Sequence, residues 1–378
     1  MMKHLVTYIF ISALAAVLAA CGGRVAERSP SAPHIFPDYA GVTVPVNIAP
    51  LNFRLDGFDG RARARLEADA ERVTVSTRDG AFRLPQRGWR RLCTAAVAAD
   101  VDISVTVEAR DGDGVWRRYA PFVIRVSEDE IDPYMVYRLI EPGYETWGEM
   151  GIYQRCLETF REEPVIETSS AGYGCVNCHT FRSQDPDMML FHMRQTHAGT
   201  MLLREGRIER LNTATDSTIS STVYPSWHPS GRYIAFSVNA TKLITLPDES
   251  NRVEVFDSAS DVVVYDTERH ELYSVPELMR GDRFETFPSF SPAGDKLYFC
   301  TADSVEMPAR YKEARYSLCS IGFDAASGRI GRDVDTLCNA RTTGRSVSFP
   351  RVSPDGAFML YALSDYGTFS IWHRDADL

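Results

Sequence analysis

Residues Tyr224–Phe236 read YPSWHPSGRYIAF, and the pattern returns at Phe287–Phe299 as FPSFSPAGDKLYF and at Phe349–Tyr361 as FPRVSPDGAFMLY. The copies begin 63 and 62 residues apart. A fixed period of this kind is typical of a repeat architecture. Each copy contains a short strand, a Pro-x-Gly hairpin turn and a second strand of alternating character. The sequence therefore predicts an antiparallel strand repeat over the C-terminal half of the chain.

A short strand, a turn and an alternating strand are how a four-stranded propeller blade begins. The pattern aromatic-Pro-x-x-Ser-Pro-x-Gly resembles the repeat of TolB-type, six-bladed (WD-type) β-propellers, although His228 and Ser230 replace the usual Ser and Asp in the first copy. The resemblance covers residues 200–378 and implies a propeller. It leaves the ligand open, because propellers serve binding, scaffolding and enzymatic roles alike. We expect a protein or glycan partner at the propeller face.

The spacing also predicts inserts and an incomplete ring. One blade usually takes ~40 to 45 residues, so the longer period implies extra loops, as between Asn239 and Ser258. Only about three blades can be counted, and Asp375–Leu378 stops where a third strand is due. Either an N-terminal domain completes the structure or the chain is a truncated copy of a longer protein, and we favour truncation.

The segment 43–127 shows a different, period-two pattern. Runs such as Arg72–Ser76 and Asp102–Val107 alternate in polarity, and turn-like stretches such as Arg78–Gly80 separate them. Several short strands within fewer than 100 residues predict an immunoglobulin-like β-sandwich. The fold class is therefore mainly β, with this sandwich before the propeller.

Between these domains, in a connector over 128–199, the chain carries Cys175-Val176-Asn177-Cys178-His179. C-x-x-C-H is the attachment motif of a c-type haem, and roughly 0.004 chance matches are expected for this composition. Cys175 and Cys178 would hold one haem c covalently, and His179 would be the proximal iron ligand. A thiol redox pair or half of a zinc site is the alternative, but a second C-x-x-C is missing from the sequence.

The residues after the motif predict a short helix that could fold over the porphyrin. Asp185 can cap it, Pro186 suits its first position, and Gly199 would end it. On such a helix Met189, His192 and Met193 can turn toward the haem together. We expect His192 to be the sixth ligand of the iron. The alternatives are an open position or one of the remaining candidates, which are Met188, Met189, Met193 and His197.

The N-terminus predicts export and lipid attachment. Residues 1–20 form a basic start and a short apolar run, and Leu18–Cys21 resembles a bacterial lipobox with Cys21 as the acylated residue. Residues 21–42 then read as a proline-bearing tether. We expect a lipid-anchored protein of the cell envelope, at the outer membrane. Haem is attached to c-type cytochromes outside the cytoplasmic membrane, so both motifs point to one compartment.

Five cysteines remain, an odd number, so at least one thiol stays unpaired within the chain. Cys300 and Cys319 could form a cross-strand bridge, or they could be buried as small hydrophobic residues. The pairing within this set stays open: Cys93, Cys156, Cys300, Cys319 and Cys338.

Composition and charge narrow the function. With 44% hydrophobic residues the chain can form globular cores, and a formal charge of −10 argues against a nucleic-acid partner. Carboxylates such as Asp261, Asp282 and Asp365 show no acid–base spacing, so we expect no enzyme. The leading hypothesis is a membrane-anchored monohaem cytochrome-like lipoprotein that transfers or senses electrons. The alternatives are a propeller scaffold with a structural haem or none, and a thiol oxidoreductase.

Overall fold

The computed structural model describes residues 27–110, 112, 114–140, 150–245, 253–367 and 376–377. The signal peptide and Cys21 lie outside these residues. The chain divides into two compact units, the first with residues 27–135 and 154–163, the second with residues 136–140, 150–153 and the rest. The fold is mainly β, as predicted. In the described part of the chain, no helix is long and apolar enough to cross a membrane.

The first unit is built on a seven-stranded sheet with the order β1-β9-β8-β10-β3, to which β5 and β6 are added through β8. A small second sheet has the order β2-β4-β7. Alternate residues of β5 are buried, as a half-buried strand requires. The elements are β1 (Glu27–Arg28), β2 (Ile35–Phe36), β3 (Thr43–Pro45), β4 (Phe53–Leu55), β5 (Ala62–Ala68), β6 (Glu71–Thr77), β7 (Ala81–Phe82), α2 (Gln86–Ala99), β8 (Ile103–Arg110), β9 (Trp116–Arg118) and β10 (Phe122–Ser127).

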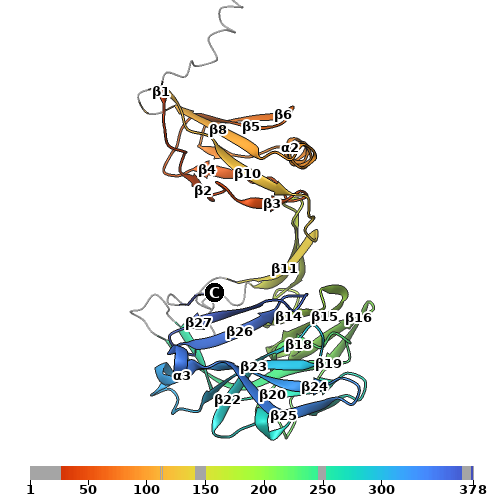
Figure 1. Ribbon diagram of the computed structural model, residues 1–378. Coiled ribbons are helices and arrows are strands. Elements are labelled where there is room, and N and C mark those ends of the chain that lie inside the picture. The colour runs from red at the N-terminus through yellow and green to blue at the C-terminus, as the bar shows by residue number, and fades with distance from the viewer. Residues whose placement is uncertain are drawn as a thin grey trace, which may run out of the picture. The chain divides into compact units, whose positions relative to one another are not determined.

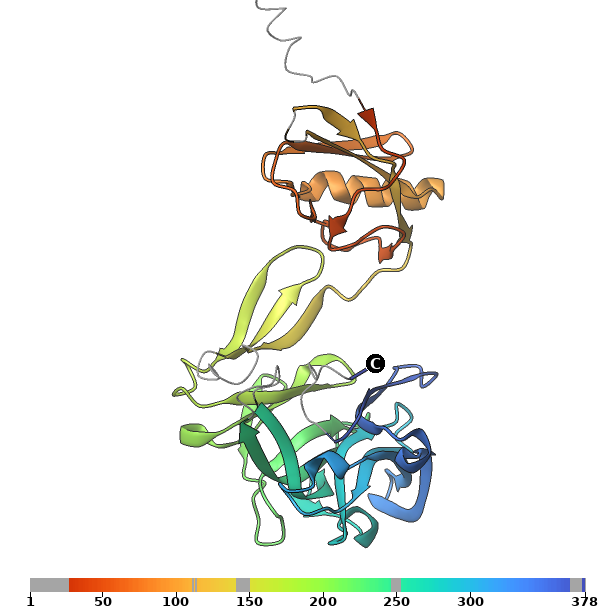
Figure 2. The same cartoon turned by 90° about the vertical axis from the view of Figure 1, so that its left-hand side faces the viewer.

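Helix α2 corrects the prediction of an immunoglobulin-like sandwich over 43–127. It packs against β5, β6, β8 and β10, so a helix covers the sheet face that a second large sheet would cover (Figure 2). Its buried side chains Trp89, Leu92, Cys93 and Ala96 recur at the spacing of a single helix face. The Trp89 indole also donates to the Ile48 carbonyl oxygen at 3.0 Å. The segments around the helix are short strands that alternate in polarity. This alternation dominated the sequence pattern of 43–127, so the pattern did not indicate the helix.

The second unit contains three four-stranded antiparallel sheets followed by a hairpin, each with its strands in chain order (Figure 1). We call them blades one to four. Their strands are β14 (Val176–Arg182), β15 (Asp185–Met193), β16 (Gly199–Arg204) and β17 (Arg207–Leu211); β18 (Thr222–Trp227), β19 (Tyr233–Thr245), β20 (Val253–Asp266) and β21 (Glu271–Tyr273); β22 (Arg283–Phe290), β23 (Lys296–Asp303), β24 (Ser317–Asp324) and β25 (Arg329–Cys338); and β26 (Ser346–Val352) and β27 (Met359–Ser364).

The smaller elements are a three-stranded sheet and short helical turns. The sheet has the order β11-β12-β13, from β11 (Tyr134–Leu139), β12 (Gly151–Cys156) and β13 (Glu162–Glu167). The turns are η2 (Gln195–His197), η3 (Pro276–Leu278), η4 (Tyr311–Glu313) and α3 (Ala340–Thr343). Within the residues described, the blades do not close into a ring.

The blades confirm the repeat and the expected insert. The three sequence copies begin in β18, β22 and β26, the first strand of blades two, three and four. The insert between Asn239 and Ser258 extends β19 and β20 into a long paired ribbon, in which Thr245 is still opposite Val253.

The predicted helix over 186–197 is wrong. Residues Asp185–Met193 form β15, which pairs with β14 on one side and with β16 on the other. Residues Leu190–Met193 are buried in succession, because both faces of this strand are covered. Strand pairing therefore decided the structure of a segment whose capping residues favoured a helix. The blades also begin at Val176, before the predicted boundary at residue 200.

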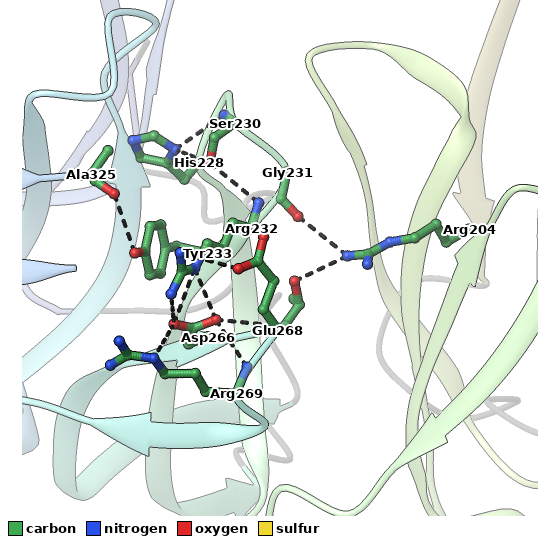
Figure 3. A network of polar contacts seen from close by, with 11 residues as sticks. Arg204, His228, Ser230, Gly231, Arg232, Tyr233, Asp266, Glu268, Arg269 and Ala325 are labelled. Carbon is green, nitrogen blue, oxygen red and sulfur yellow. Dashed lines mark hydrogen bonds and ion pairs between the residues drawn. The ribbon is translucent and has the colours of Figure 1, made fainter. Parts of the chain in front are cut away.

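Apolar contacts and one polar network join successive blades. Leu190 and Leu202 of blade one share a cluster with Trp227 and Phe236 of blade two. Around the turn of blade two, Arg232 pairs with Asp266 at 2.7 Å (Figure 3). His228 and Ser230, the departures from the repeat pattern, bond to each other there, and His228 Nε2 is 3.0 Å from the Gly294 carbonyl oxygen of blade three. His228 therefore makes a structural contact between blades two and three, and Ser230 holds its ring from within the same turn.

All seven cysteines in the described residues are free thiols. Cys300 packs in the cluster with Phe284 and Tyr316, whereas Cys319 packs with Phe299 and Ile321. The two thiols lie on opposite faces of blade three. The considered Cys300–Cys319 bridge does not form, and both residues act as small buried hydrophobic groups.

Candidate functional site

The first strand of every blade contains the same irregularity. The strand pairing shifts between Asn177 and Thr180 in β14, and at the corresponding places in β18, β22 and β26. The first bulged residue has a left-handed backbone, which is rare for residues other than glycine. Its φ is +54° at Cys178, +48° at Tyr224, +53° at Phe287 and +52° at Phe349. Cys178-His179 therefore takes the place that aromatic-Pro takes in the other three blades.

The three aromatic residues of this position gather together. The ring of Phe287 lies 4.8 Å from Tyr224 and 4.4 Å from Phe349, and Tyr224 lies 6.1 Å from Phe349. In blades two to four, the side chain of the first bulged residue therefore points toward a common centre. Cys178 is the fourth member of the set, and it replaces a ring by a thiol.

A cavity of about 880 Å³ opens beside this centre. Cys178, His179 and His192 line it, together with Tyr224 and Phe349. Its volume is that of a cofactor or drug-sized ligand site. The full lining is Arg138, Asn177, Cys178, His179, His192, Met193, Arg194, Gln195, Ala198, Gly199, Thr200, Asn212, Thr213, Ala214, Ser220, Ser221, Thr222, Val223, Tyr224, Asn239, Thr241, Phe349 and Arg351.

The two thiols of the motif are in different surroundings. Cys178 lines the cavity, and Cys175 packs against the apolar cluster that contains Val176, Met189 and Met201. Burial raises the pKa of both thiols. A raised pKa keeps them protonated at neutral pH, whereas a redox-active cysteine needs a lowered one. The thiol oxidoreductase alternative loses support from this.

His179 is half-buried, and its Nε2 lies 3.2 Å from the carbonyl oxygen of Val136. Nε2 therefore carries the proton and donates to this oxygen. Burial lowers the pKa of the imidazole, so the ring is neutral. To bind a metal through Nε2, His179 would exchange this hydrogen bond for the metal.

His192 has an unusual environment for a core histidine. Only 4% of it is exposed, and burial lowers its pKa to about 3. Its Nδ1 lies 2.9 Å from Thr200 Oγ1, whereas Nε2 has no hydrogen-bond partner. Thr200 Oγ1 lies 3.4 Å from Thr222 Oγ1, which lies 2.7 Å from Thr213 Oγ1. A threonine relay thus fixes the ring while one buried nitrogen stays unsatisfied.

The other predicted ligands are distributed over both faces of β15. Met189 and Met193 pack with Phe191 in the cluster on the face opposite His192, although Met193 also reaches the cavity lining. Met188 packs against the cluster between blades one and two, and His197 is exposed in η2. The predicted shared face of Met189, His192 and Met193 is wrong, because strand neighbours alternate.

The histidines and cysteines do not form a ready metal site. Within the described residues, no three His, Cys, Asp or Glu side chains converge at metal-binding distance. The structure brings Cys178, His179 and His192 to one cavity without bringing them to one point.

Sequence reasoning missed three arginines of the cavity wall: Arg138, Arg194 and Arg351. For one of them, the repeat pattern in the sequence contains an indication. Arg351 follows the proline of its repeat copy, where the other two copies have Ser226 and Ser289. This departure from the repeat could have marked Arg351 as a candidate site residue.

Comparison with known proteins identifies no family, since neither a family model nor a curated protein matches the chain. Among solved structures, an oligogalacturonate lyase in complex with manganese aligns with a TM-score of 0.36 and 12% identity, over 61% of this chain and 58% of that one. Porphyromonas gingivalis dipeptidyl peptidase 4 aligns at 0.35 and 13%, over 64% and 40%. An oligogalacturonate lyase from Vibrio parahaemolyticus aligns at 0.34 and 12%, over 88% and 86%. These weak likenesses carry no conclusion about activity.

Proposed function

We propose that this protein is a membrane-anchored monohaem lipoprotein of the c-type cytochrome kind, which transfers or senses electrons. The blades would serve as a recognition module for a protein or glycan partner. The observation that carries the proposal is the position of Cys178-His179, which replaces the repeat's aromatic-Pro pair and lines a cavity of about 880 Å³ with His192.

Three of the four residues that a haem c would use, Cys178, His179 and His192, line the cavity, whereas Cys175 packs against the apolar cluster of Met189 and Met201. Cys175 and Cys178 would hold the porphyrin through thioethers, His179 would bind the iron, and His192 would be the second iron ligand. When bound, haem iron supplies a one-electron couple. The chain's part is to bind and orient it. Both imidazoles are neutral, which metal ligation requires.

The unsatisfied Nε2 of His192 supports its assignment as the sixth ligand. Leaving a buried polar atom without a partner costs about 1–3 kcal/mol. A ligand at this atom would remove the cost. The relay suits such a ligand if Nδ1 donates to Thr200, because each threonine hydroxyl can then accept one hydrogen bond and donate the next.

The test of cofactor and function uses the full chain from a host that attaches haem c. Mass spectrometry should show one haem per chain that survives denaturation, and the spectrum should change reversibly in a redox titration. Apoprotein from a competent host would contradict the haem. A haem that is attached but cannot be cycled reversibly would favour the second candidate.

That second candidate is a propeller scaffold with a structural haem or none. The hydrogen bond from His179 to Val136 favours it, because a satisfied histidine needs no metal. In this case the blades alone would carry the function, and variants without haem would still bind the partner.

The anchor is a separate part of the proposal. Because Cys21 would carry the lipid, Cys21→Ser should move the protein from the membrane fraction to the soluble fraction. Cys156→Ser is a matched control that should leave the protein at the membrane. Equal membrane binding of Cys21→Ser and the parent would contradict the lipobox.

A further inference from the structure

We propose that Arg138, Arg194 and Arg351 form a carboxylate-binding wall, which holds the two propionates of the haem; this inference rests on the proposed function. The ligand chemistry is a pair of carboxylates presented by a planar, apolar ring system. The three arginines come from β11, from the end of β15 and from β26, so that only the folded unit brings them to one cavity.

The charge of the cavity is opposite to that of the chain. The protein carries a formal charge of −10, yet the cavity lining contains three arginines and neither Asp nor Glu. In the part of the chain that the structure describes, none of the three is in an ion pair with a carboxylate. Arg232, at the turn of blade two, is by contrast paired with Asp266. A basic, acid-free recess in an acidic protein attracts anions.

The motif itself orients Arg138. Nη1 of Arg138 donates to Asn177 Oδ1 at 2.5 Å, and the same oxygen accepts the backbone N–H of Cys178 at 2.7 Å. Asn177 is one of the two middle residues of C-x-x-C-H. A guanidinium has five N–H donors in a planar fork, so this bond leaves donors for a bidentate carboxylate.

Arg351 is placed by the repeat. In blade two, the equivalent Ser226 Oγ accepts the backbone N–H of Phe290 and so joins two blades. Blade four has an arginine at this position, and its side chain lines the cavity. Blades one and four thus depart from the repeat at the same bulge, and both departures face the same cavity.

All three arginines line the cavity that Cys178 also lines. Propionates at the edge of a ring attached at Cys178 would meet this positive wall.

The first experiment restores the repeat with Arg351→Ser, and the matched control is Arg207→Ser, an exposed arginine of β17 that does not line the cavity. Mass spectrometry first confirms haem on each protein. We expect the midpoint potential of Arg351→Ser to fall, since a positive charge near the iron is lost, and to vary with pH where that of the control is constant. An attached haem with unchanged potential and pH profile overturns the arginine wall but not the haem. Absence of haem from the parent overturns the proposed function.

The second experiment does not depend on haem attachment or on iron. The full chain with Cys175→Ala and Cys178→Ala is titrated with iron-free protoporphyrin IX and with its dimethyl ester, followed by porphyrin fluorescence. We expect the free acid to bind roughly tenfold more tightly, as one ion pair worth about 1.4 kcal/mol would give. Adding Arg351→Ser should remove most of this preference. Equal affinity for acid and ester overturns the proposal.

Discussion

Blade one differs from blades two and three at the place where all share one backbone geometry. In blades two and three, Tyr224 and Phe287 occupy the left-handed bulge position and their rings meet at 4.8 Å. In blade one, Cys178 adopts the same backbone and carries a thiol instead of a ring. Aromatic contacts of this kind contribute about 0.5–1.5 kcal/mol beyond their burial. Blade one lacks this contact, and it has a thiol and an imidazole beside a cavity instead.

The difference shows that the repeat determines where the side chain at the bulge lies. The type of residue at that position, and with it the chemistry, can vary between blades. Strand pairing on both sides of the bulge determines where the side chain points. The residue at that point can then change without altering the blade.

The largest effect is expected when blade one is converted to the repeat. The double change Cys178→Phe and His179→Pro should abolish haem attachment completely, because one thioether and the proximal ligand are lost together. The cavity beside Cys178 has room for the ring. Mass spectrometry and far-ultraviolet circular dichroism of the purified protein should show a folded chain without haem.

The control for this conversion is Cys338→Ala in blade three, which removes a thiol outside the motif. It should keep one haem per chain. Haem retained by the double variant would show that the attachment site is elsewhere.

A change at the equivalent position of blade three should lower stability without affecting haem attachment. Phe287 is only 2% exposed, and Phe287→Ala should lower the free energy of unfolding by about 3–5 kcal/mol. Cys178→Ala, at the equivalent position of the haem-free chain, should cost no more than about 1 kcal/mol, because a thiol buries far less apolar surface than a phenyl ring. Urea denaturation of both variants measures the contrast. Equal losses would mean that blade one relies on this position as strongly as blade three does.

The absorption spectrum of the haem can show which face of β15 supplies the sixth ligand. His192→Ala should convert the ferric haem from low spin to high spin, since it removes the proposed sixth ligand. Met189 is buried on the opposite face, so Met189→Ala should leave the spectrum unchanged and lower stability by about 2–5 kcal/mol. If only the methionine change alters the spin state, the assignment of His192 fails.

A smaller effect should come from the buried carboxyl of Asp257 in blade two. Burial raises its pKa to about 7, although Asn239 donates to it at 2.8 Å. An unfolded Asp titrates near 3.9, so the folded chain binds more protons between about pH 4 and pH 7. The free energy of unfolding contributed by this group should therefore fall as pH rises through that window.

Asp257→Asn should reduce this slope, because the amide keeps the acceptor for Asn239 and does not titrate. Urea denaturation at several pH values measures it. Glu285, whose pKa burial also raises to about 7, should keep part of the slope in the variant. An unchanged slope would show that Asp257 is not the buried acid responsible.

Much of the β structure was readable from local patterns. The aromatic-Pro and Pro-x-Gly spacing predicted blades two to four, because the turn and the alternation are properties of neighbouring residues. The helix α2 was missed, although Trp89, Leu92, Cys93 and Ala96 have helical spacing. The helix proposed over 186–197 was wrong, since Asp185 and Pro186 permit a helix start but pairing with β14 and β16 outweighs it.

The sequence by itself determined the candidate chemistry, since C-x-x-C-H binds through residues that are neighbours in the chain. Only the tertiary structure decided that Cys178-His179 occupies the bulge position of the repeat. The bulge is a shift in the pairing with β15 between Asn177 and Thr180. The tertiary structure also decided that His192 faces Thr200 with one nitrogen unsatisfied, and that three arginines distant in sequence share a wall. The physical reason is that strand order and pairing register, which arise from contacts between distant segments, set where each side chain points.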